Sequence, residues 1–296
     1  MQEVLDALHP FQLQRAGVRG RVVRLESAWA EISERADYPE QVMRLLGESV
    51  AASALFAGAL KFEGSLSIHL RNAGALRLLF AECTHEGHLR GIARLDETSD
   101  SSGIDLLDSR AQLAITIENR KSDTRYQGLV SVETPSLSGA FEGYFAQSEQ
   151  LPTRIVLAAS AGRCAGIMLQ QVSGEGGVSA TLDSDGWNRV GHLLATLTEN
   201  ELLDLPVETL LLRLFHEEEI LLQPPRMLSF ECSCSHERVA GMLLSLGSDE
   251  VHAALAESGD MQITCEFCNR DYRFDKVDVA ALFAANPLAP GTQSQQ

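Results

Sequence analysis

The sequence predicts an α+β protein with a mixed sheet-and-helix domain at its N-terminus, a mostly helical linker and a small C-terminal module with paired cysteines. Three observations support this: strand-like alternation in the first half, helical periodicity after a glycine-rich break, and two cysteine pairs near the end. The chain has 296 residues with a hydrophobic content of 45% and can bury a sizeable core. We expect the domain to span residues 1–172, the linker 173–230 and the module 231–287, followed by a disordered tail over 288–296.

The elements of the N-terminal domain can be followed along the chain. Residues 18–25 form a short strand, and Pro39 suits the first turn of an apolar helix that ends near Leu60. Residues 65–70 alternate with a period of two and pair, after a turn, with residues 76–81. Short polar connections favour an antiparallel meander. The strands that complete and close this sheet are residues 89–95, 112–118, 126–132, 154–159 and 166–172, with a helix capped by Ser136 or Ser138 before the last two.

The linker begins at a flexible break over residues 173–177, Ser-Gly-Glu-Gly-Gly. Helical spacing resumes after it, and Thr198 and Glu201 fit a capping box. The run 210–215 is so apolar that it must pack on something in the resting protein. We interpret the acidic run 217–219 as a solvated patch, because consecutive carboxylates point to different faces of a helix.

Four of the six cysteines form two close pairs in the module, Cys232 with Cys234 and Cys265 with Cys268. Between them, Ser235 can cap a helix, and the segment is long enough to bring the pairs together. Four converging thiolates suit one tetrahedral zinc ion, with Zn–S distances of about 2.3 Å. Two roles stay open for such a centre: a redox switch, or a plain structural zinc site.

The module has few other apolar residues, so metal binding would supply much of its folding free energy, about 10 kcal/mol in small zinc peptides. A peroxide- or hypochlorite-type oxidant can convert a thiolate to a sulfenic acid, which condenses with a neighbouring thiol. Each disulfide removes two ligands, so we expect the metal to be lost and the module to unfold. The apolar linker is the element best placed to be released, although a linker that merely belongs to the core is an equal alternative.

Other chemically active side chains have simpler interpretations. Cys83 and Cys164 lie in apolar, strand-like surroundings, and we expect both to be buried. His85 and His88 flank a turn that we expect to be solvated, and His236 stays outside a ligand set that four cysteines complete. The sequence has no GxSxG motif, phosphate-binding loop or paired carboxylates, so we expect no catalytic residues and no enzyme.

Charge and segment composition limit the partners. The formal net charge of −17 opposes binding to nucleic-acid backbones and to anionic membranes. Neither a signal peptide nor a transmembrane stretch is apparent, so we expect a cytoplasmic protein. Thiols are kept reduced in that compartment, where clustered cysteines are typical of metal binding or redox sensing.

Two further functions compete with a redox switch. A thiol oxidoreductase would use Cys265 and Cys268, but it needs the CxxC motif at a helix N-terminus, and the residues that follow indicate a strand. A nucleic-acid-binding zinc protein would be basic, whereas this chain has ten acidic and four basic residues from Glu231 to its end.

Several motifs together resemble the redox-regulated 33-kDa molecular chaperones, the heat-shock protein 33 family, over nearly the whole chain. The Cys232–Cys234 and Cys265–Cys268 pairs have a spacing typical of that family. The remaining motifs are Tyr38-Pro39, Lys61-Phe62-Glu63-Gly64, Gly91-Ile92-Ala93-Arg94, Arg125-Tyr126-Gln127-Gly128, Tyr144-Phe145, Ser148-Glu149-Gln150-Leu151-Pro152-Thr153-Arg154 and His216-Glu217-Glu218-Glu219.

The resemblance implies a stress-response holdase that binds unfolding client proteins without ATP. Its reduced form is expected to be inactive and to bind zinc through Cys232, Cys234, Cys265 and Cys268. Oxidation is expected to form the disulfides Cys232–Cys234 and Cys265–Cys268, release zinc, unfold the linker over residues 173–230 and give active homodimers.

Overall fold

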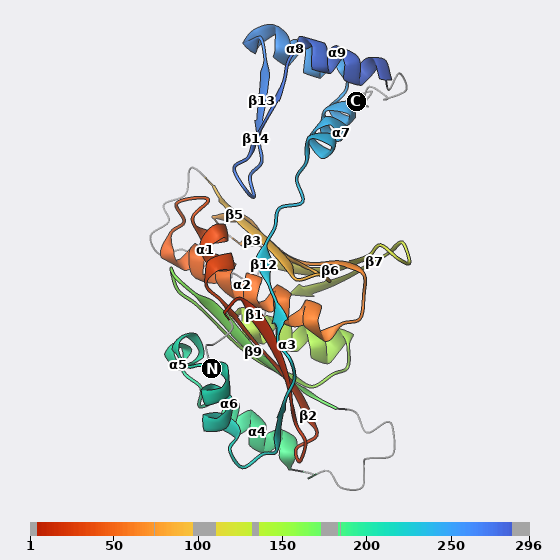
Figure 1. The fold of residues 1–296 in the computed structure, drawn as a ribbon. Helices are drawn as coiled ribbons and strands as arrows, with labels where there is room; N and C mark the ends of the chain where they lie inside the picture. The colour runs from red at the N-terminus through yellow and green to blue at the C-terminus, as the bar shows by residue number, and fades with distance from the viewer. Residues whose placement is uncertain are drawn as a thin grey trace. The chain divides into compact units, whose positions relative to one another are not determined.

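The computed structural model describes residues 5–73, 75–96, 111–131, 136–172, 183 and 185–285. The chain divides into two compact units, Met1–Glu231 and Cys232–Gln296 (Figure 1). The predicted glycine-rich break at 173–177 and the predicted tail over 288–296 lie outside the described residues.

The first unit contains two sheets instead of the single predicted meander. One sheet has the order β10-β1-β2-β9-β8, with β11 also paired to β1. The other has the order β12-β5-β4-β3-β6-β7. The first sheet consists of β1 (Ala7–Leu13), β2 (Val18–Leu25), β8 (Thr153–Ala159), β9 (Cys164–Gln171), β10 (Ile220–Leu222) and β11 (Arg226–Met227). The second consists of β3 (Gly64–Ala73), β4 (Leu76–Thr84), β5 (His88–Leu95), β6 (Gln112–Asn119), β7 (Thr124–Ser131) and β12 (Ser229–Phe230).

The prediction that the two late strands close the meander is therefore wrong. The predicted β3–β4 pairing is confirmed, but β6 pairs with β3 and not with β5. The late strands β8 and β9 pair with each other, and β9 pairs with β2 in the other sheet. These pairings connect segments far apart in sequence, which local alternation does not specify.

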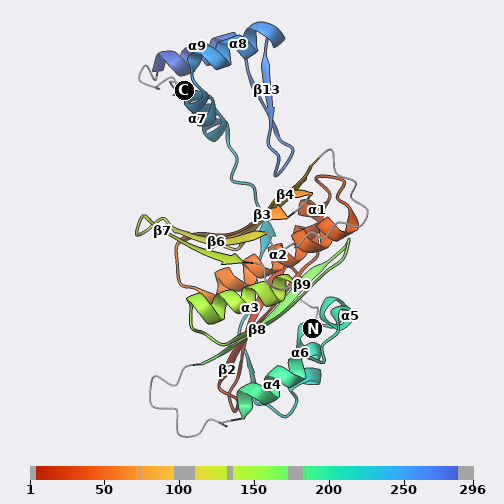
Figure 2. The same ribbon diagram turned by 180° about the vertical axis from the view of Figure 1, so that it is seen from behind.

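Helix α2 (Glu40–Ala59) lies between the two sheets (Figure 2). It is long and apolar enough to cross a membrane by length and composition, yet it is mostly buried in the core, as in the core helix of a soluble protein. Its apolar side chains pack with both sheets in one cluster that includes Trp29, Leu55 and Phe56. A helix that is apolar on most of its faces needs such two-sided cover, and this requirement explains the two sheets.

Two smaller helices complete this layer. Helix α3 (Leu137–Ser148) begins at Ser136, whose hydroxyl accepts a hydrogen bond from the Gly139 amide, as predicted. Phe56 of α2 makes edge-to-face contacts with Phe141 and Phe145. Sequence reasoning missed helix α1 (Ser27–Ser33). The Asp6 carboxylate accepts hydrogen bonds from the first amides of this helix, so a distant residue replaces the usual local cap.

The outer face of the first sheet is covered by the helices of the predicted linker. Neighbouring residues Val22 and Val23 of β2 face opposite sides, Val22 toward these helices and Val23 toward the α2 cluster. Most of the apolar run is buried as expected, but Leu212 is exposed. Phe215 stacks on Phe11 at a ring distance of 6.3 Å. The predicted capping box of Thr198 is present. The three helices are α4 (Gly186–Leu194), α5 (Glu199–Asp204) and α6 (Val207–Phe215).

The interpretation of residues 217–219 as a solvated patch is wrong for Glu218. Its carboxylate is buried at 6% residue exposure and accepts a 2.8 Å hydrogen bond from Nε of Arg189 in α4. Glu217 and Glu219 are exposed. The chain therefore uses one acidic residue of the run to hold α4 against the segment after α6.

The described part of the second unit, residues 232–285, contains a two-stranded sheet and three helices. Ser235 caps α7 through its hydroxyl, and Gly247 ends that helix. The apolar cluster of the described residues has six buried members, namely Leu243, Val251, Leu255, Tyr272, Phe274 and Val279. Its elements are α7 (His236–Leu246), α8 (Ser248–Ser258), β13 (Met261–Thr264), β14 (Asp271–Phe274) and α9 (Lys276–Ala285).

Candidate metal centre

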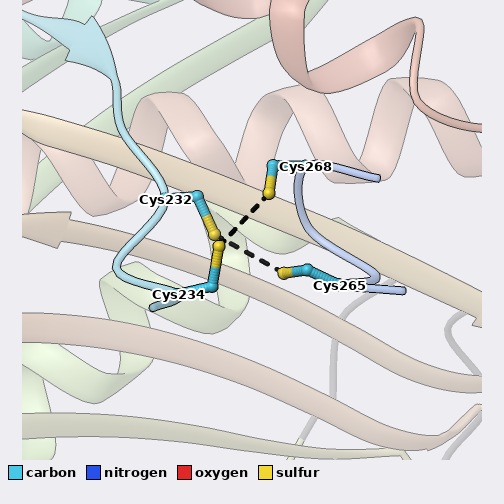
Figure 3. A group of neighbouring side chains, drawn as sticks. All are labelled: Cys232, Cys234, Cys265 and Cys268. Carbon is cyan, nitrogen blue, oxygen red and sulfur yellow. Dashed lines mark hydrogen bonds between the residues drawn. The ribbon is translucent and has the colours of Figure 1, made fainter. Parts of the chain in front are cut away.

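The structure brings the four predicted cysteines together in the second unit. Cys232 and Cys234 lie on the extended segment that leads into α7, and Cys265 and Cys268 lie on the turn between β13 and β14 (Figure 3). The four sulfur atoms lie within 4.8 Å of one another. Among the described residues, this is the one group of three or more His, Cys, Asp or Glu side chains that could hold a metal ion.

The sulfur positions fit a tetrahedral ion. Zn–S distances of about 2.3 Å place two ligand sulfurs about 3.8 Å apart in a regular tetrahedron. Sγ of Cys232 lies 3.7 Å from Sγ of Cys265, and Sγ of Cys234 lies 3.4 Å from Sγ of Cys268. All four cysteines are free and only partly exposed. The donor set of four thiols matches zinc and other thiophilic metals, and a modest contraction or expansion brings it to zinc geometry.

Local hydrogen bonds hold both cysteine segments in place. In the β13–β14 turn, the Cys265 amide donates to the Arg270 carbonyl at 2.9 Å and the Asn269 amide donates to the Cys265 carbonyl at 2.7 Å. Asn269 has a φ of 57°, in the left-handed region that asparagine tolerates. In the other segment, the Arg238 guanidinium donates to the Ser233 carbonyl and hydroxyl. The ligand positions are therefore held by backbone and side-chain bonds that do not involve the thiols.

The thiols differ in their readiness to ionise. Burial opposes ionisation of Cys234, but hydrogen bonds from the Tyr272 hydroxyl and the neighbouring thiols outweigh it and lower the pKa to about 7. The Tyr272 hydroxyl lies 3.0 Å from Sγ of Cys234. Burial raises the pKa of Cys232 and, less strongly, that of Cys268. One thiolate forms readily, and a bound cation would favour ionisation of the others.

Sequence reasoning missed Tyr272 as part of the site. The alternation with Phe274 predicted a strand there, and β14 confirms it. Nothing in that alternation indicated that the hydroxyl would reach a sulfur atom. Because Tyr272 lies opposite Ile263, two residues from Cys265 across the β13–β14 pair, its position depends on the register of the hairpin.

Among the described residues, no other cysteine or histidine belongs to the four-thiol group. Cys83 and Cys164 are fully buried as predicted, and burial raises the pKa of Cys83 to about 12. His236 stacks on Phe274 with ring centroids 4.4 Å apart. His85 and His88 flank a turn with an exposed Glu86, as the sequence predicted. Both histidines are partly exposed, and Nδ1 of His88 lies 2.6 Å from the Glu231 carboxylate.

The CxxC motif lacks the feature that a thiol oxidoreductase uses. Cys265 and Cys268 occupy a turn followed by strand β14, as the sequence predicted, and not a helix N-terminus. A helix N-terminus would lower the pKa of the first thiol and activate it as a nucleophile.

The fold and the site together define a class of protein: a two-sheet α+β unit followed by a small unit with a four-cysteine group that could hold a metal ion. The family model described as Hsp33 protein matches residues 6–275. The chain belongs to this Hsp33 family of chaperones.

Curated relatives and a solved structure agree with the family. The chain is 38% identical over 290 residues to a 33 kDa chaperonin of Nitrosococcus oceani, covering 98% of each chain. It is 42% identical over 282 residues to a 33 kDa chaperonin of Pseudomonas savastanoi, covering 94% of each. The crystal structure of the 33 kDa chaperonin, a heat shock protein 33 homolog, from Thermotoga maritima superposes with a TM-score of 0.78 at 18% identity and covers 95% of this chain and 99% of that one. This last likeness supports the fold.

Proposed function

We propose that this protein is a redox-regulated, ATP-independent holdase that binds unfolding client proteins under oxidative stress. The observation that carries the proposal is the four-thiol group in a unit that buries little else. In a site of this kind, the free energy of metal binding is part of the free energy of folding. An oxidant that removes the ligands can therefore unfold the whole second unit. The chaperonin names of the relatives supply the class of activity.

In the reduced protein, Cys232, Cys234, Cys265 and Cys268 would hold one zinc ion. Bound zinc keeps thiolates deprotonated and joins the segment before α7 to the β13–β14 turn. The Tyr272 hydroxyl would donate to the Cys234 thiolate and orient it. The partial exposure of all four cysteines leaves the sulfurs open to a small oxidant.

Oxidation would proceed through a sulfenic acid. A thiolate attacks hydrogen peroxide, which gives Cys–SOH and hydroxide, and the sulfenic acid condenses with a second thiol to form a disulfide and water. Each disulfide consumes one peroxide and removes two ligands. The pairs would be Cys232–Cys234 and Cys265–Cys268, each within its own segment.

The alternative pairs deserve a direct test because they would act differently. Cys232 with Cys265, and Cys234 with Cys268, have Sγ separations of 3.7 and 3.4 Å in the reduced structure. Disulfides across these pairs would keep the two segments joined and preserve the second unit. Disulfides within each segment would leave the segments unlinked, so only this pattern turns oxidation into unfolding.

We further propose that unfolding of the module, residues 231–287, destabilises the linker over 173–230 and exposes client-binding apolar surface on the core domain, 1–172. Helices α4 to α6 bury a continuous apolar cluster against the first sheet, so their release would expose both faces. The active form would be a homodimer in the cytoplasm with no catalytic residue and no nucleic-acid or membrane partner. The net charge of −17 supports the last point.

The test follows metal release and client protection in one sample. The reduced, zinc-loaded protein is treated with peroxide at raised temperature while a zinc-responsive dye and the light scattering of a heat-unfolded client are recorded. We expect zinc release and suppression of aggregation to rise together, and reductant plus zinc to reverse both. Full suppression by the reduced, zinc-loaded protein, or zinc release without suppression, would contradict the proposal.

Disulfide mapping separates the two pairing patterns. Non-reducing proteolysis and mass spectrometry of the oxidised protein should give intact loops within each segment and no peptide linked across them. A Cys83→Ser variant serves as the matched control, because Cys83 is buried and its thiol is held un-ionised. This variant should release zinc at the unaltered rate.

A further inference from the structure

One short segment closes the edges of both sheets in the first unit. We call residues 220–231 the strap, which is drawn in cyan in Figure 1. Its β10 and β11 pair with residues 11–13 and 7–8 of β1, and its β12 pairs with residues 88–89 of β5. An uncovered sheet edge carries free amide and carbonyl groups and readily accepts another strand. The strap therefore covers two such edges with strands of two or three residues.

The edge of β1 is poorly suited to any other strand. Pro10 lies in the middle of this strand, and its carbonyl accepts a 2.9 Å hydrogen bond from the Gln223 amide of the strap. Pro10 has no amide hydrogen to donate toward the strap in return. The strap has Pro224 and Pro225 next to this position, and these residues also lack an amide hydrogen. A proline on an edge strand is a common means of blocking strand addition.

The edge of β5 has no such block. Its eight residues, His88–Leu95, contain no proline, and β12 covers only two of them. The Ser229 amide donates to the Gly87 carbonyl and the Glu231 amide to the Leu89 carbonyl, each at 3.1 Å. Further along, the Ala93 amide donates to the Tyr38 hydroxyl at 3.4 Å. A side chain, and not a strand, therefore accepts the hydrogen bond of this edge amide. A longer strand could replace both contacts.

Side chains of the first unit hold β12 in place, as far as the residue before Cys232. Leu228 is 5% exposed and packs in the main core cluster, and the Arg35 guanidinium lies 5.3 Å from the centre of the Phe230 ring. Nδ1 of His88 lies 2.6 Å from the carboxylate of Glu231, which directly precedes Cys232. The backbone also approaches closely at Gly87, where φ is 98° and an added Cβ would lie 2.6 Å from the Met227 carbonyl oxygen. If the second unit unfolds, these contacts within the first unit are all that holds the C-terminal end of the strap.

We propose that β12 can be displaced from the edge of β5, and that this edge then binds an extended segment of a client polypeptide by strand addition. This inference rests on the proposed function, in which oxidation frees the strap. An unfolding protein supplies the required chemistry, an extended backbone with unpaired amides and carbonyls, whatever its sequence. The position vacated by Leu228 would receive an apolar client side chain, and the backbone bonds would account for binding to many different clients.

The test uses the oxidised, full-length protein and hydrogen–deuterium exchange read by mass spectrometry. The probe is a peptide of about ten residues with alternating valine and threonine. Oxidation should increase exchange at residues 88–95, and the peptide should reduce it there while residues 7–13 remain unprotected. A second peptide, N-methylated at consecutive central residues, keeps the side chains but lacks donors on both edges. It should bind about tenfold more weakly or worse, as expected for the loss of two or more main-chain hydrogen bonds.

A Pro10→Val variant is the matched control for the choice of edge. It restores an amide donor to β1, so the peptide should now protect residues 7–13 as well. Equal protection of both edges in the unaltered protein would overturn the assignment to β5. Protection of residues 88–95 that appears without peptide and grows with protein concentration would assign the edge to a second copy of the chain instead.

The outcomes separate this inference from the proposed function. If the oxidised protein suppresses client aggregation but the two peptides bind equally well, or protection appears away from residues 88–95, strand addition is wrong and the holdase proposal stands. If the oxidised protein neither suppresses aggregation nor binds either peptide, both proposals fail.

Discussion

The two units of this chain differ in what holds them together. In the first unit, two sheets enclose α2 on both sides, and a second apolar cluster lies under the linker helices. In the second unit, the described residues bury six apolar side chains, while Met242, Leu246 and Val277 remain exposed. Such a small core offers a few kcal/mol of stability at best. We therefore expect the second unit to depend on a metal held by the four thiols, whereas the first unit is held by burial.

The difference explains why the cysteines are distributed as they are. Cys83 and Cys164, in the first unit, are completely buried, and burial raises the pKa of each above its usual value. The four cysteines of the second unit are partly exposed, and one has a pKa of about 7. Among the described residues, the accessible thiols thus occur only in the second unit, so under the proposed function an oxidant would act on the unit that it can unfold.

Metal removal should produce the largest difference in stability between the two units. Chelation of zinc from the reduced protein should unfold the second unit, because metal binding in small zinc peptides contributes about 10 kcal/mol. Hydrogen exchange should become fast in α7, β13 and β14, while α2 and the β3–β4 pair keep their protection. The first unit serves as the internal control. Persistent protection of the β13–β14 pair after chelation would show that the small core is sufficient.

Sequence patterns predicted the parts of the fold that depend on neighbouring residues. Helix α2, the β3–β4 pair, the Ser136, Thr198 and Ser235 caps and the four-cysteine group were all predictable, because periodicity, capping and spacing are local signals. The whole of β1 and the strap strands β10 to β12 were missed, since their residues are ordered by partners far away in sequence.

The same limit applied to single side chains. Asp6 caps a helix more than twenty residues ahead of it, Glu218 is buried against Arg189, and Tyr272 reaches a sulfur across a hairpin. Each contact requires a register or a packing angle that composition does not specify. Polar side chains of these types are usually exposed. The sequence alone therefore does not indicate that these particular ones are buried or which partner they contact.

Shortening one buried side chain of the linker tests whether the linker is part of the first unit's core. Phe215 is 0% exposed and stacks on Phe11, so Phe215→Ala should cost about 3–5 kcal/mol in the free energy of unfolding of the first unit. Urea denaturation of the zinc-loaded protein measures this. Leu212→Ala on the same helix is the control, because Leu212 is 60% exposed and its loss should change stability by less than about 0.5 kcal/mol. Equal effects would mean that α6 is only loosely held on the sheet.

A charge pair gives the next smaller effect. Nε and Nη2 of Arg189 lie 2.8 and 2.7 Å from Glu218 Oε1, and this carboxylate is almost fully buried. Arg189→Gln should destabilise the docked linker by about 1.5–3 kcal/mol, since a buried carboxylate loses its charged partner. Arg213→Gln is the matched control, because Arg213 pairs with Glu201 at the surface and such pairs contribute about 0–1 kcal/mol. The difference between the two variants in urea midpoint should vanish if Glu218 is solvated instead.

Removal of one hydroxyl should give the smallest effect, and it tests the second unit alone. In Tyr272→Phe, the Cys234 thiolate loses a donor at 3.0 Å, so zinc affinity should fall by about tenfold in competition with a chromophoric chelator. Tyr126→Phe in the first unit is the control and should leave the affinity unchanged.

The pH dependence of that deficit identifies its cause. The hydroxyl helps to lower the pKa of Cys234 to about 7, so without it the thiol stays protonated to higher pH and zinc must displace an additional proton. The difference in affinity between variant and unaltered protein should therefore be largest below about pH 7, where zinc must displace the thiol proton in both proteins and that proton is held more tightly in the variant. It should shrink above about pH 9, where both thiols are ionised. A deficit that is constant with pH would mean that Tyr272 acts by packing in the small core and not through the thiolate, which would place more of the second unit's stability in burial than the comparison assigns to it.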